Sequence, residues 1–257
     1  VFTLLVDGTP LATHFGAEGA QWQWQRGGTV TLPQGTVALA LHDLTGFEGR
    51  CDAILFAHDA VFVPPNTEPD LTQLRQRLGA LPVDTLEAGP FDLAVVGGGI
   101  AGVCAALSAA RLGVRVALIQ DRPVLGGNNS SEVRVWLSGQ INFPPYPRVG
   151  DIVRELDPYT TECPGPPAMY GDDLKLRLVQ AEPNITLILD NRVVAAETAD
   201  GSITAAVARD IRSGQQTRIK ATLFADCTGD GCLGALAGAD FEETREGHMG
   251  PTNLWRV

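Results

Sequence analysis

The pattern of hydrophobic and polar positions is that of a parallel α/β fold from about residue 90 onward. Residues 93–96 and 114–119 are short apolar runs with the β-branched bias of buried parallel strands. The Ala-rich stretch between them, residues 100–112, predicts a helix that ends at Gly113. A strand, a helix and a second strand in this order predict a βαβ unit.

Further along the chain, the pattern predicts one more parallel strand and then a β-meander. The strands are expected at 184–190 and, for the meander, at 192–197, 203–210 and 216–221, with Gly201 and Gly214 in the turns. Two helices are expected near 151–156 and 172–181, and prolines predict loops at 142–147 and 163–167.

The first part of the chain has a different, antiparallel pattern. Short strand-like runs at 1–6, 29–32, 37–42, 53–56 and 61–63 are separated by glycine-containing turns. They predict a small antiparallel β-sandwich. A Pro-bearing connector with a short helix at 71–78 follows. We therefore expect a β-sandwich segment at 1–66, a linker at 67–90 and an α/β domain at 91–257.

Three glycines stand where the first parallel strand turns into the helix. Gly97, Gly99 and Gly102 form a G-x-G-x-x-G motif between predicted elements of the right kind. Gly97 permits the tight turn, Gly99 lets a pyrophosphate approach the backbone, and Gly102 lets the helix pack against the strand. Free N–H groups at the helix start then face the phosphates. The motif predicts a Rossmann-like dinucleotide-binding domain, and an accidental glycine-rich turn is the alternative.

The residue expected to contact the adenosine ribose departs from the usual pattern. A carboxylate normally ends the second strand, but Gln120 stands there and Asp121 follows it. Gln120 can bond ribose hydroxyls without a charge, whereas Asp121 offers a charged acceptor. We favour Gln120 from its position and keep Asp121 as the alternative.

Composition and charge exclude some function classes. The 257 residues carry a formal net charge of -11, which argues against a phosphate-tracking nucleic-acid surface. No apolar run approaches the length of a membrane span, and no signal peptide opens the chain. The sequence begins at Val1 without an initiator Met, so we expect the true N-terminus to be missing. A cytoplasmic and an exported location both stay open.

The cysteines do not form a disulfide or metal-binding pattern. Their number, five, is odd, and their spacing does not suit metal ligands. Cys227 and Cys232 have four residues between them, as in the redox-active pair of flavin disulfide reductases. In those enzymes the pair lies elsewhere in the chain, so we favour two small buried thiols beside a turn.

A second glycine pair carries the resemblance to a known family. Residues 121–131, Asp-Arg-Pro-Val-Leu-Gly-Gly-Asn-Asn-Ser-Ser, resemble the segment that wraps the flavin in FAD oxidoreductases of the glutathione-reductase type. Residues 223–231, with their Thr-Gly-Asp-Gly turn, resemble the strand and turn that close the nucleotide domain in these flavoproteins. Over residues 91–250 the chain is similar to bacterial members of the FAD-dependent oxidoreductase family.

This resemblance implies FAD, rather than NAD, as the cofactor, and hydride transfer between FAD and a small-molecule substrate. A carbohydrate-related substrate is one expectation. The family also implies a later substrate domain, so we expect this chain to be the N-terminal portion of an enzyme that does not turn over alone. The implied cofactor-binding residues are Gly97, Gly99, Ile100, Ala101, Gly102, Gln120, Asp121, Arg122, Gly126, Gly127, Asn128, Ser131, Val193, Thr228, Gly229 and Asp230.

The N-terminal segment carries a less specific resemblance. Residues 44–56 resemble the end of a carbohydrate-binding-like β-sandwich. Trp22 and Trp24 alternate with glutamines and would face one side of a strand, where they could stack on a sugar or pack in a core. We keep a glycan contact open and favour packing.

No catalytic residue is assigned from the sequence. Arg134, Tyr146, Tyr170 and His248 are the loop residues that we would examine for substrate contacts, although a structural role is favoured for each. Two functions remain to be compared. One is the FAD-dependent oxidoreductase, which the intact glycine motif favours, and the other is a glycan- or partner-binding module on a degenerate nucleotide-binding scaffold.

Overall fold

The structure of the chain is a computed structural model. It describes residues 1–19, 21–46, 51–67, 69–79, 82–139, 141, 143–157, 162–244 and 247. The chain divides into two compact units, Val1–Ala80 and Leu81–Val257.

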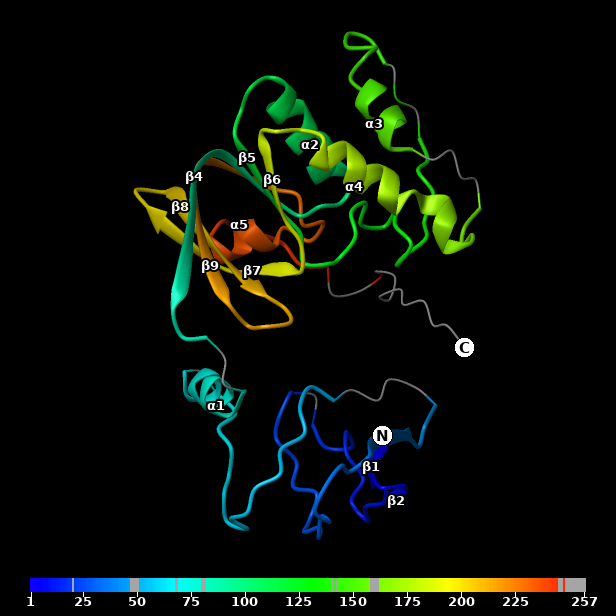
Figure 1. Ribbon diagram of the computed structural model, residues 1–257, viewed down its shortest axis with the longest axis vertical. Helices are drawn as coiled ribbons and strands as arrows, with labels where there is room; N and C mark the ends of the chain where they lie inside the picture. Colours follow the sequence, from blue (N-terminus) through cyan, green and yellow to red (C-terminus); the bar gives the residue numbers. More distant parts are fainter. Residues whose placement is uncertain are drawn as a thin grey trace. The chain divides into compact units, whose positions relative to one another are not determined.

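The larger unit contains a six-stranded mixed sheet (Figure 1). Its strands, in the order in which they lie side by side, are β6 (Ile185–Ile188), β5 (Val116–Ile119), β4 (Thr85–Val96), β9 (Gln216–Asp226), β8 (Ser202–Asp210) and β7 (Asn191–Ala199). The first four strands are parallel, and β8 and β7 are antiparallel to their neighbours. The expected α/β domain with a parallel sheet and a β-meander is therefore confirmed.

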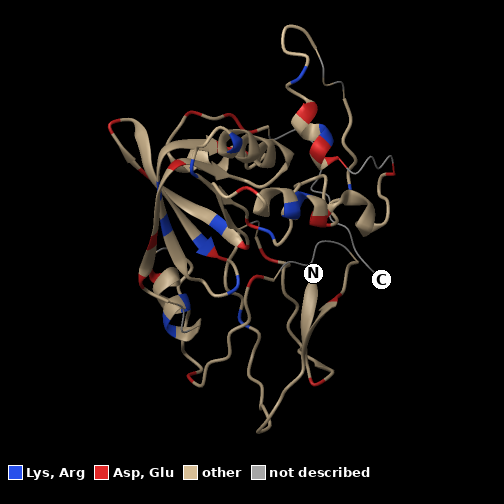
Figure 2. Ribbon diagram, turned by 45° about the horizontal axis from the view of Figure 1, so that its top comes forward, with Lys and Arg blue, Asp and Glu red and all other residues tan. Residues whose placement is uncertain are grey.

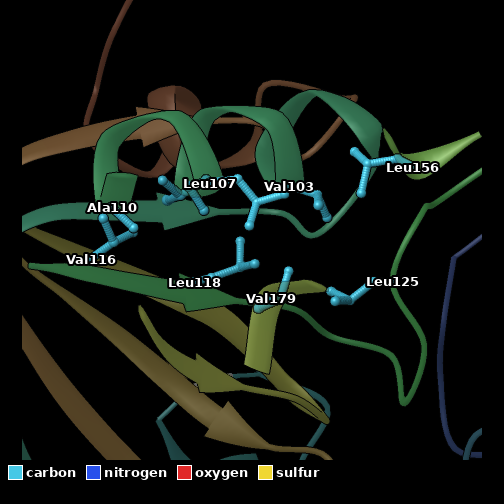
Figure 3. Close-up of a cluster of buried hydrophobic side chains, with 10 residues drawn as sticks. Val103, Leu107, Ala110, Val116, Leu118, Leu125, Leu156 and Val179 are labelled. Carbon is cyan, nitrogen blue, oxygen red and sulfur yellow. The ribbon is translucent and has the colours of Figure 1, made fainter. Parts of the chain in front are cut away.

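Helices cover the parallel strands. The bounds are α2 (Ile100–Arg111), α3 (Asp151–Leu156), α4 (Asp172–Gln180) and α5 (Cys232–Leu236), with a 3₁₀ turn at Pro167–Tyr170. Three of them, α2, α3 and α4, contribute to one apolar cluster with Val95 and Leu118 of the sheet (Figure 3). On the opposite face, Leu233 of α5 packs with Ala94 and Ile119.

The two clusters explain why the predicted parallel strands are continuous apolar runs. Alternate residues of β4 and β5 point to opposite faces, and both faces are covered. Burying a side chain such as Leu107 or Leu118, each with no exposed surface, contributes roughly 1.5–3 kcal/mol. The carboxyl ends of β4 and β5 are thereby held in fixed positions.

Two expectations about the strands are corrected. The strand before the glycine motif begins at Thr85, inside the expected linker, because residues 85–88 pair in parallel with β9. The sequence pattern did not predict this part of the strand, because Gly89 and Pro90 are unfavourable within a strand. The pairing of β4 with β9 shifts register around these two residues. The last meander strand and the expected closing strand are one continuous strand, β9, which pairs with β8 and β4 on its two edges.

The smaller unit has one antiparallel sheet and one helix. The sheet has the order β2 (Thr9–Pro10), β1 (Phe2–Val6) and β3 (Leu39–Asp43), and the helix is α1 (Asp70–Gly79). Thr3 of β1 anchors the following loop, since its hydroxyl lies 2.9 Å from the Leu11 carbonyl oxygen and 3.0 Å from that of Thr13. The small antiparallel sheet and the helix were expected.

The expected second layer of a sandwich does not form within the described residues of this unit. Residues 29–32, 53–56 and 61–63 are not strands. These runs are only three or four residues long, and without a paired neighbour β-propensity does not make a strand. Few apolar side chains are buried among the described residues here, namely Phe2, Leu4 and Leu74.

The placement of the two tryptophans on a strand is also wrong. Neither Trp22 nor Trp24 lies in a strand, so the alternation argument does not apply to them. The Trp24 indole Nε1–H donates to the Pro65 carbonyl oxygen at 3.1 Å, which is a structural contact. Trp22 is 66% exposed.

Candidate functional site

The two glycine segments of the sequence meet at the carboxyl ends of β4 and β5. The first is the turn between β4 and α2, and the second follows β5. The Gly126 N–H donates to the Gly98 carbonyl oxygen at 2.8 Å, and Gly99 and Gly126 form a parallel bridge. A Cβ atom on Gly127 would stand 3.1 Å from the Gly99 Cα. The segments therefore contact each other backbone to backbone.

Two glycines of the first turn are required by packing. Gly97 has φ +104°, and a Cβ atom there would stand 2.2 Å from the Cys227 carbonyl oxygen. A Cβ atom on Gly102 would stand 1.8 Å from the Gly97 carbonyl oxygen. Side chains at these positions are excluded by the protein itself, in agreement with the turn and packing roles expected from the motif.

Gly99 is different, because the fold does not require a glycine there. Its φ is -65° and its ψ is 177°, which is ordinary extended backbone. Apart from Gly99 and its two neighbours in the chain, no residue of the described chain has an atom within 4 Å of the position that a Cβ would occupy. A glycine here instead leaves open space in front of the first turn of α2. That space is where a pyrophosphate would approach the backbone.

The start of α2 supplies the donors for such a group. Gly99 is the N-cap residue and makes no side-chain capping hydrogen bond. Ile100, Ala101 and Gly102 form the first turn of the helix, and their N–H groups lie at the positive end of the helix dipole. The residues present therefore fit the phosphate part of a dinucleotide.

Gln120 directly follows β5 and joins the two glycine segments. Its side chain is 5% exposed. The Oε1 atom accepts a hydrogen bond from the Gly98 N–H at 2.8 Å, and Nε2 donates to the Val124 carbonyl oxygen at 3.2 Å. Asp121 is exposed, and within the described part of the chain its carboxylate makes no hydrogen bond or ion pair.

The second glycine segment is supported by its own polar side chains. The Ser130 hydroxyl donates to the Gly127 carbonyl oxygen at 2.6 Å, and the Ser131 N–H donates to Asp172 Oδ1 at 3.0 Å. Asn129 is 2% exposed, and its Nδ2 donates to the Val135 carbonyl oxygen at 3.1 Å. Its Oδ1 has no hydrogen-bond partner among the described residues.

A buried lysine lies behind this segment. Lys175 of α4 has no exposed surface, and a Cβ atom on Gly126 would stand 3.0 Å from its Cε. Its ammonium donates to the Tyr170 carbonyl oxygen. Burial lowers the pKa of Lys175, and the charges of Asp172 and Asp157 act in the opposite direction. The sequence analysis did not identify Lys175. Its spacing of four residues from the apolar Val179, which places both on one face of α4, was the signal that could have indicated its burial.

The third part of the site is the turn after β9. Asp226 Oδ1 accepts from the Thr228 N–H at 3.0 Å and from the Thr228 hydroxyl at 2.7 Å, while Oδ2 accepts from the Gly234 N–H at 2.9 Å. Partial desolvation raises the pKa of Asp226, but these hydrogen bonds outweigh it and hold the pKa below its usual value. Gly229 and Asp230 are left exposed at the tip of the turn.

The structure places the other implied cofactor residues around these three segments. Arg122 forms an ion pair with Glu132 at 2.9 Å. Asn128 is exposed beside the second glycine pair. Val193 lies on β7, two residues after Asn191, whose N–H donates to the Gln120 carbonyl oxygen at 2.9 Å. The implied residues thus come from segments that meet at the carboxyl end of the sheet.

The four loop residues that were named for examination, with a structural role favoured, lie in different surroundings where the structure describes them. Tyr170 is fully buried, and its hydroxyl lies 2.6 Å from the Arg134 carbonyl oxygen and accepts from the Gly165 N–H at 2.9 Å. Arg134 donates from Nε to the Ser131 carbonyl oxygen at 2.9 Å. Both contacts are structural. Tyr146 is 72% exposed, and His248 lies outside the described residues.

Neither metal nor membrane features accompany this site in the described residues. The described His, Cys, Asp and Glu side chains form no group of three or more that could hold a metal ion. No helix in the described ranges is long and apolar enough to cross a membrane. Figure 2 shows basic residues interspersed with acidic ones along the described chain.

Comparison with known proteins identifies the family of the larger unit. A family described as FAD dependent oxidoreductase matches residues 92–253, which is more than half of the chain. The match includes both glycine segments and the turn after β9. It confirms the expected family and the expected cofactor, FAD. No similar curated protein is found.

Several solved structures are similar to part of the chain. L-proline dehydrogenase from P. horikoshii is 20% identical over 57% of this chain and 24% of its own, with a TM-score of 0.34. The GidA-related protein from Thermus thermophilus is 17% identical over 55% of this chain and 54% of its own, with a TM-score of 0.38. THI4 of Thermovibrio ammonificans is 19% identical over 65% of this chain and 66% of its own, with a TM-score of 0.42. The chain thus spans less than two thirds of the length of each.

Proposed function

Since this chain belongs to the FAD dependent oxidoreductase family, we propose that its larger unit binds FAD with the pyrophosphate at the start of α2. In this proposal the unit is the nucleotide-binding part of an enzyme that transfers hydride between FAD and a small-molecule substrate. The observation that carries it is the open space at Gly99, the one glycine of the first turn whose missing side chain meets no protein atom among the described residues.

Each segment has a distinct task in this proposal. When bound, FAD supplies the redox chemistry by accepting or donating a hydride. The N–H groups of the first turn of α2 would hold the pyrophosphate, and Gln120, directly after β5, or its neighbour Asp121 would hold the ribose. The exposed Asp230, at the tip of the turn after β9, is available to polar groups on the flavin side.

The proposal includes the finer assignment to the glutathione-reductase type of FAD-binding fold. It is supported by the contact between the first and second glycine segments and by the Thr228 turn, which packs against Gly97 through the Cys227 carbonyl oxygen. The first segment therefore contacts each of the other two through backbone atoms. A plain nicotinamide dehydrogenase has no need for the second and third segments.

The substrate in this proposal is a small molecule, and nothing in the described part of the larger unit points to a carbohydrate. Support for a carbohydrate was confined to the N-terminal segment, where Trp24 makes a structural contact and the sandwich does not form within the described residues. The binding-module alternative is not favoured, because the glycine motif and its surroundings are intact. That this chain alone is insufficient for turnover stays a prediction.

A binding experiment tests the proposed function. The purified full chain is titrated with FAD, ADP and NAD by isothermal calorimetry, and the bound flavin is recorded by its absorbance. We expect FAD and ADP to bind and to raise the melting temperature, because a ligand that binds only the folded state stabilises it. Tight NAD binding without FAD uptake would overturn the proposal. Gly99→Val serves as the site-specific control.

A further inference from the structure

Gln120 occupies the position at which dinucleotide-binding folds of this kind place a ribose-binding carboxylate. Its side chain, however, is directed into the protein. Oε1 accepts from the Gly98 N–H at 2.8 Å, and Nε2 donates to the Val124 carbonyl oxygen at 3.2 Å. A Cβ atom on Gly98 would stand 2.9 Å from the Gln120 Cβ, so the side chain is packed directly against the turn.

The backbone N–H and carbonyl groups of Gln120 also make hydrogen bonds within the protein. Its N–H donates to the Ile188 carbonyl oxygen at 2.9 Å, and its carbonyl oxygen accepts from the Asn191 N–H at 2.9 Å. Both side-chain ends and both backbone groups thus hold protein segments together. A ribose contact by Gln120 would have to come from a side chain that is 5% exposed and already bonded to protein at both ends.

Asp121 has the opposite properties. It is the next residue in the chain, it is exposed, and within the described residues its carboxylate is free of hydrogen bonds and ion pairs. A carboxylate accepts from two hydroxyls and makes stronger hydrogen bonds than a neutral amide does. It can therefore bind a ribose without disturbing the contacts between the two glycine segments.

We propose that Gln120 is a positioning residue that fastens the second glycine segment to the first, and that Asp121 is the carboxylate that binds the adenosine ribose. This inference rests on the proposed FAD site and assigns the roles of two neighbouring residues within it. It reverses the choice that spacing alone favours, because the position of a residue in the chain does not show where its side chain is used.

The experiment compares ADP with 2′-deoxy-ADP, using the full chain. Both ligands carry the pyrophosphate, and only ADP carries the 2′-hydroxyl. In the unmodified protein, loss of this hydroxyl should weaken binding roughly tenfold or more, since a hydrogen bond to a charged group is lost. In Asp121→Ala the preference for ADP should disappear. In Gln120→Met, a change of similar length, the preference should remain even though both ligands bind more weakly.

Two further measurements distinguish a Gln120 that holds the two glycine segments together from a Gln120 that contacts the ligand. Hydrogen exchange of the Gly98 and Gly126 amides, measured without ligand, should become at least about tenfold faster in Gln120→Met and stay unchanged in Asp121→Ala. Gln120→Glu should lower the melting temperature and weaken ADP, because a buried carboxylate cannot donate to the Val124 carbonyl oxygen. If Gln120 were the ribose ligand, Gln120→Glu would instead tighten ADP binding.

Three results would overturn the inference. These are tighter ADP binding by Gln120→Glu, loss of the ADP preference in Gln120→Met but not in Asp121→Ala, and equal binding of the two nucleotides by the unmodified protein. Failure of the proposed function looks different, since neither ADP nor FAD would then bind at all. In that case unchanged exchange at Gly98 in Gln120→Met would still overturn the fastening role.

Discussion

Replacing Gly99 with Val should separate cofactor binding from folding. In the ligand-free protein, the new Cβ would enter open space, because no described residue beyond the two chain neighbours has an atom within 4 Å of it and φ is -65°. Two small effects on stability oppose each other. Loss of a glycine removes freedom from the unfolded chain, worth about 0.4–1 kcal/mol, whereas Val is a poorer N-cap residue than Gly by a similar amount.

The net change in the free energy of unfolding should therefore stay within about 1 kcal/mol, or roughly 2–4 °C in melting temperature for a unit of this size. The effect on FAD should be much larger. The Val methyl groups would fill the space proposed for the pyrophosphate and keep it away from the N–H groups of α2. We expect FAD affinity to fall by at least about 100-fold, which corresponds to roughly 2.7 kcal/mol.

The matched control is Gly102→Ala, in the same motif. Its Cβ would stand 1.8 Å from the Gly97 carbonyl oxygen, so the turn and the helix must separate. Such overpacking destabilises by about 1–3 kcal/mol or more. Thermal unfolding and calorimetric FAD titration are measured for both variants. Unchanged FAD affinity in Gly99→Val would refute the reasoning, as would a loss of stability as large as that of Gly102→Ala.

Three further changes test the surroundings of the site. Gly127→Ala should lower the melting temperature and weaken ADP binding measured by calorimetry, because φ is +59° and the new Cβ would stand 3.1 Å from the Gly99 Cα. If neither the melting temperature nor ADP binding changed, the two glycine segments would not be in contact. Asp226→Ala should destabilise the protein by about 1 kcal/mol at pH 7. The folded pKa of Asp226 lies below 3.8, so the stabilisation by its carboxylate is full above that pH and is lost as the pH falls through the folded pKa. The difference in the free energy of unfolding between the unmodified protein and Asp226→Ala, measured in urea, should therefore shrink at low pH. A difference that did not shrink would contradict the role given to these hydrogen bonds. Burial lowers the folded pKa of Lys175 below 10.5. The stability of the unmodified protein relative to Lys175→Met should therefore rise with pH between the lowered pKa and 10.5. A difference in melting temperature that does not change with pH would count against the burial of the Lys175 charge.

Much of the larger unit could be predicted from the sequence because its signals are local. The buried runs at β4 and β5, the Ala-rich α2 and the glycines between them each follow from periodicity and turn chemistry over a few residues. The continuity of β9 and the early start of β4 could not be predicted in this way. Both depend on pairing between segments more than a hundred residues apart, and Gly89 and Pro90 obscure the strand locally.

The candidate site shows the same division. The three segments that form it were identified by their motifs, but the use of each side chain was not. Gln120 looks like a ligand-binding residue by its position, and only the folded chain shows that both ends of its side chain contact protein. In the smaller unit, strand-like runs were misleading because they found no neighbouring strand with which to pair.

The backbone contact between the two glycine segments has an evolutionary consequence. Gly98 and Gly99 touch Gly126 and Gly127 with no side chain between them, so the space available to each segment is set by the other. A substitution in one segment changes which residues the other can accept, and the effects of paired changes should not add. The two motifs therefore form a single epistatic unit, whose members are free to drift only together.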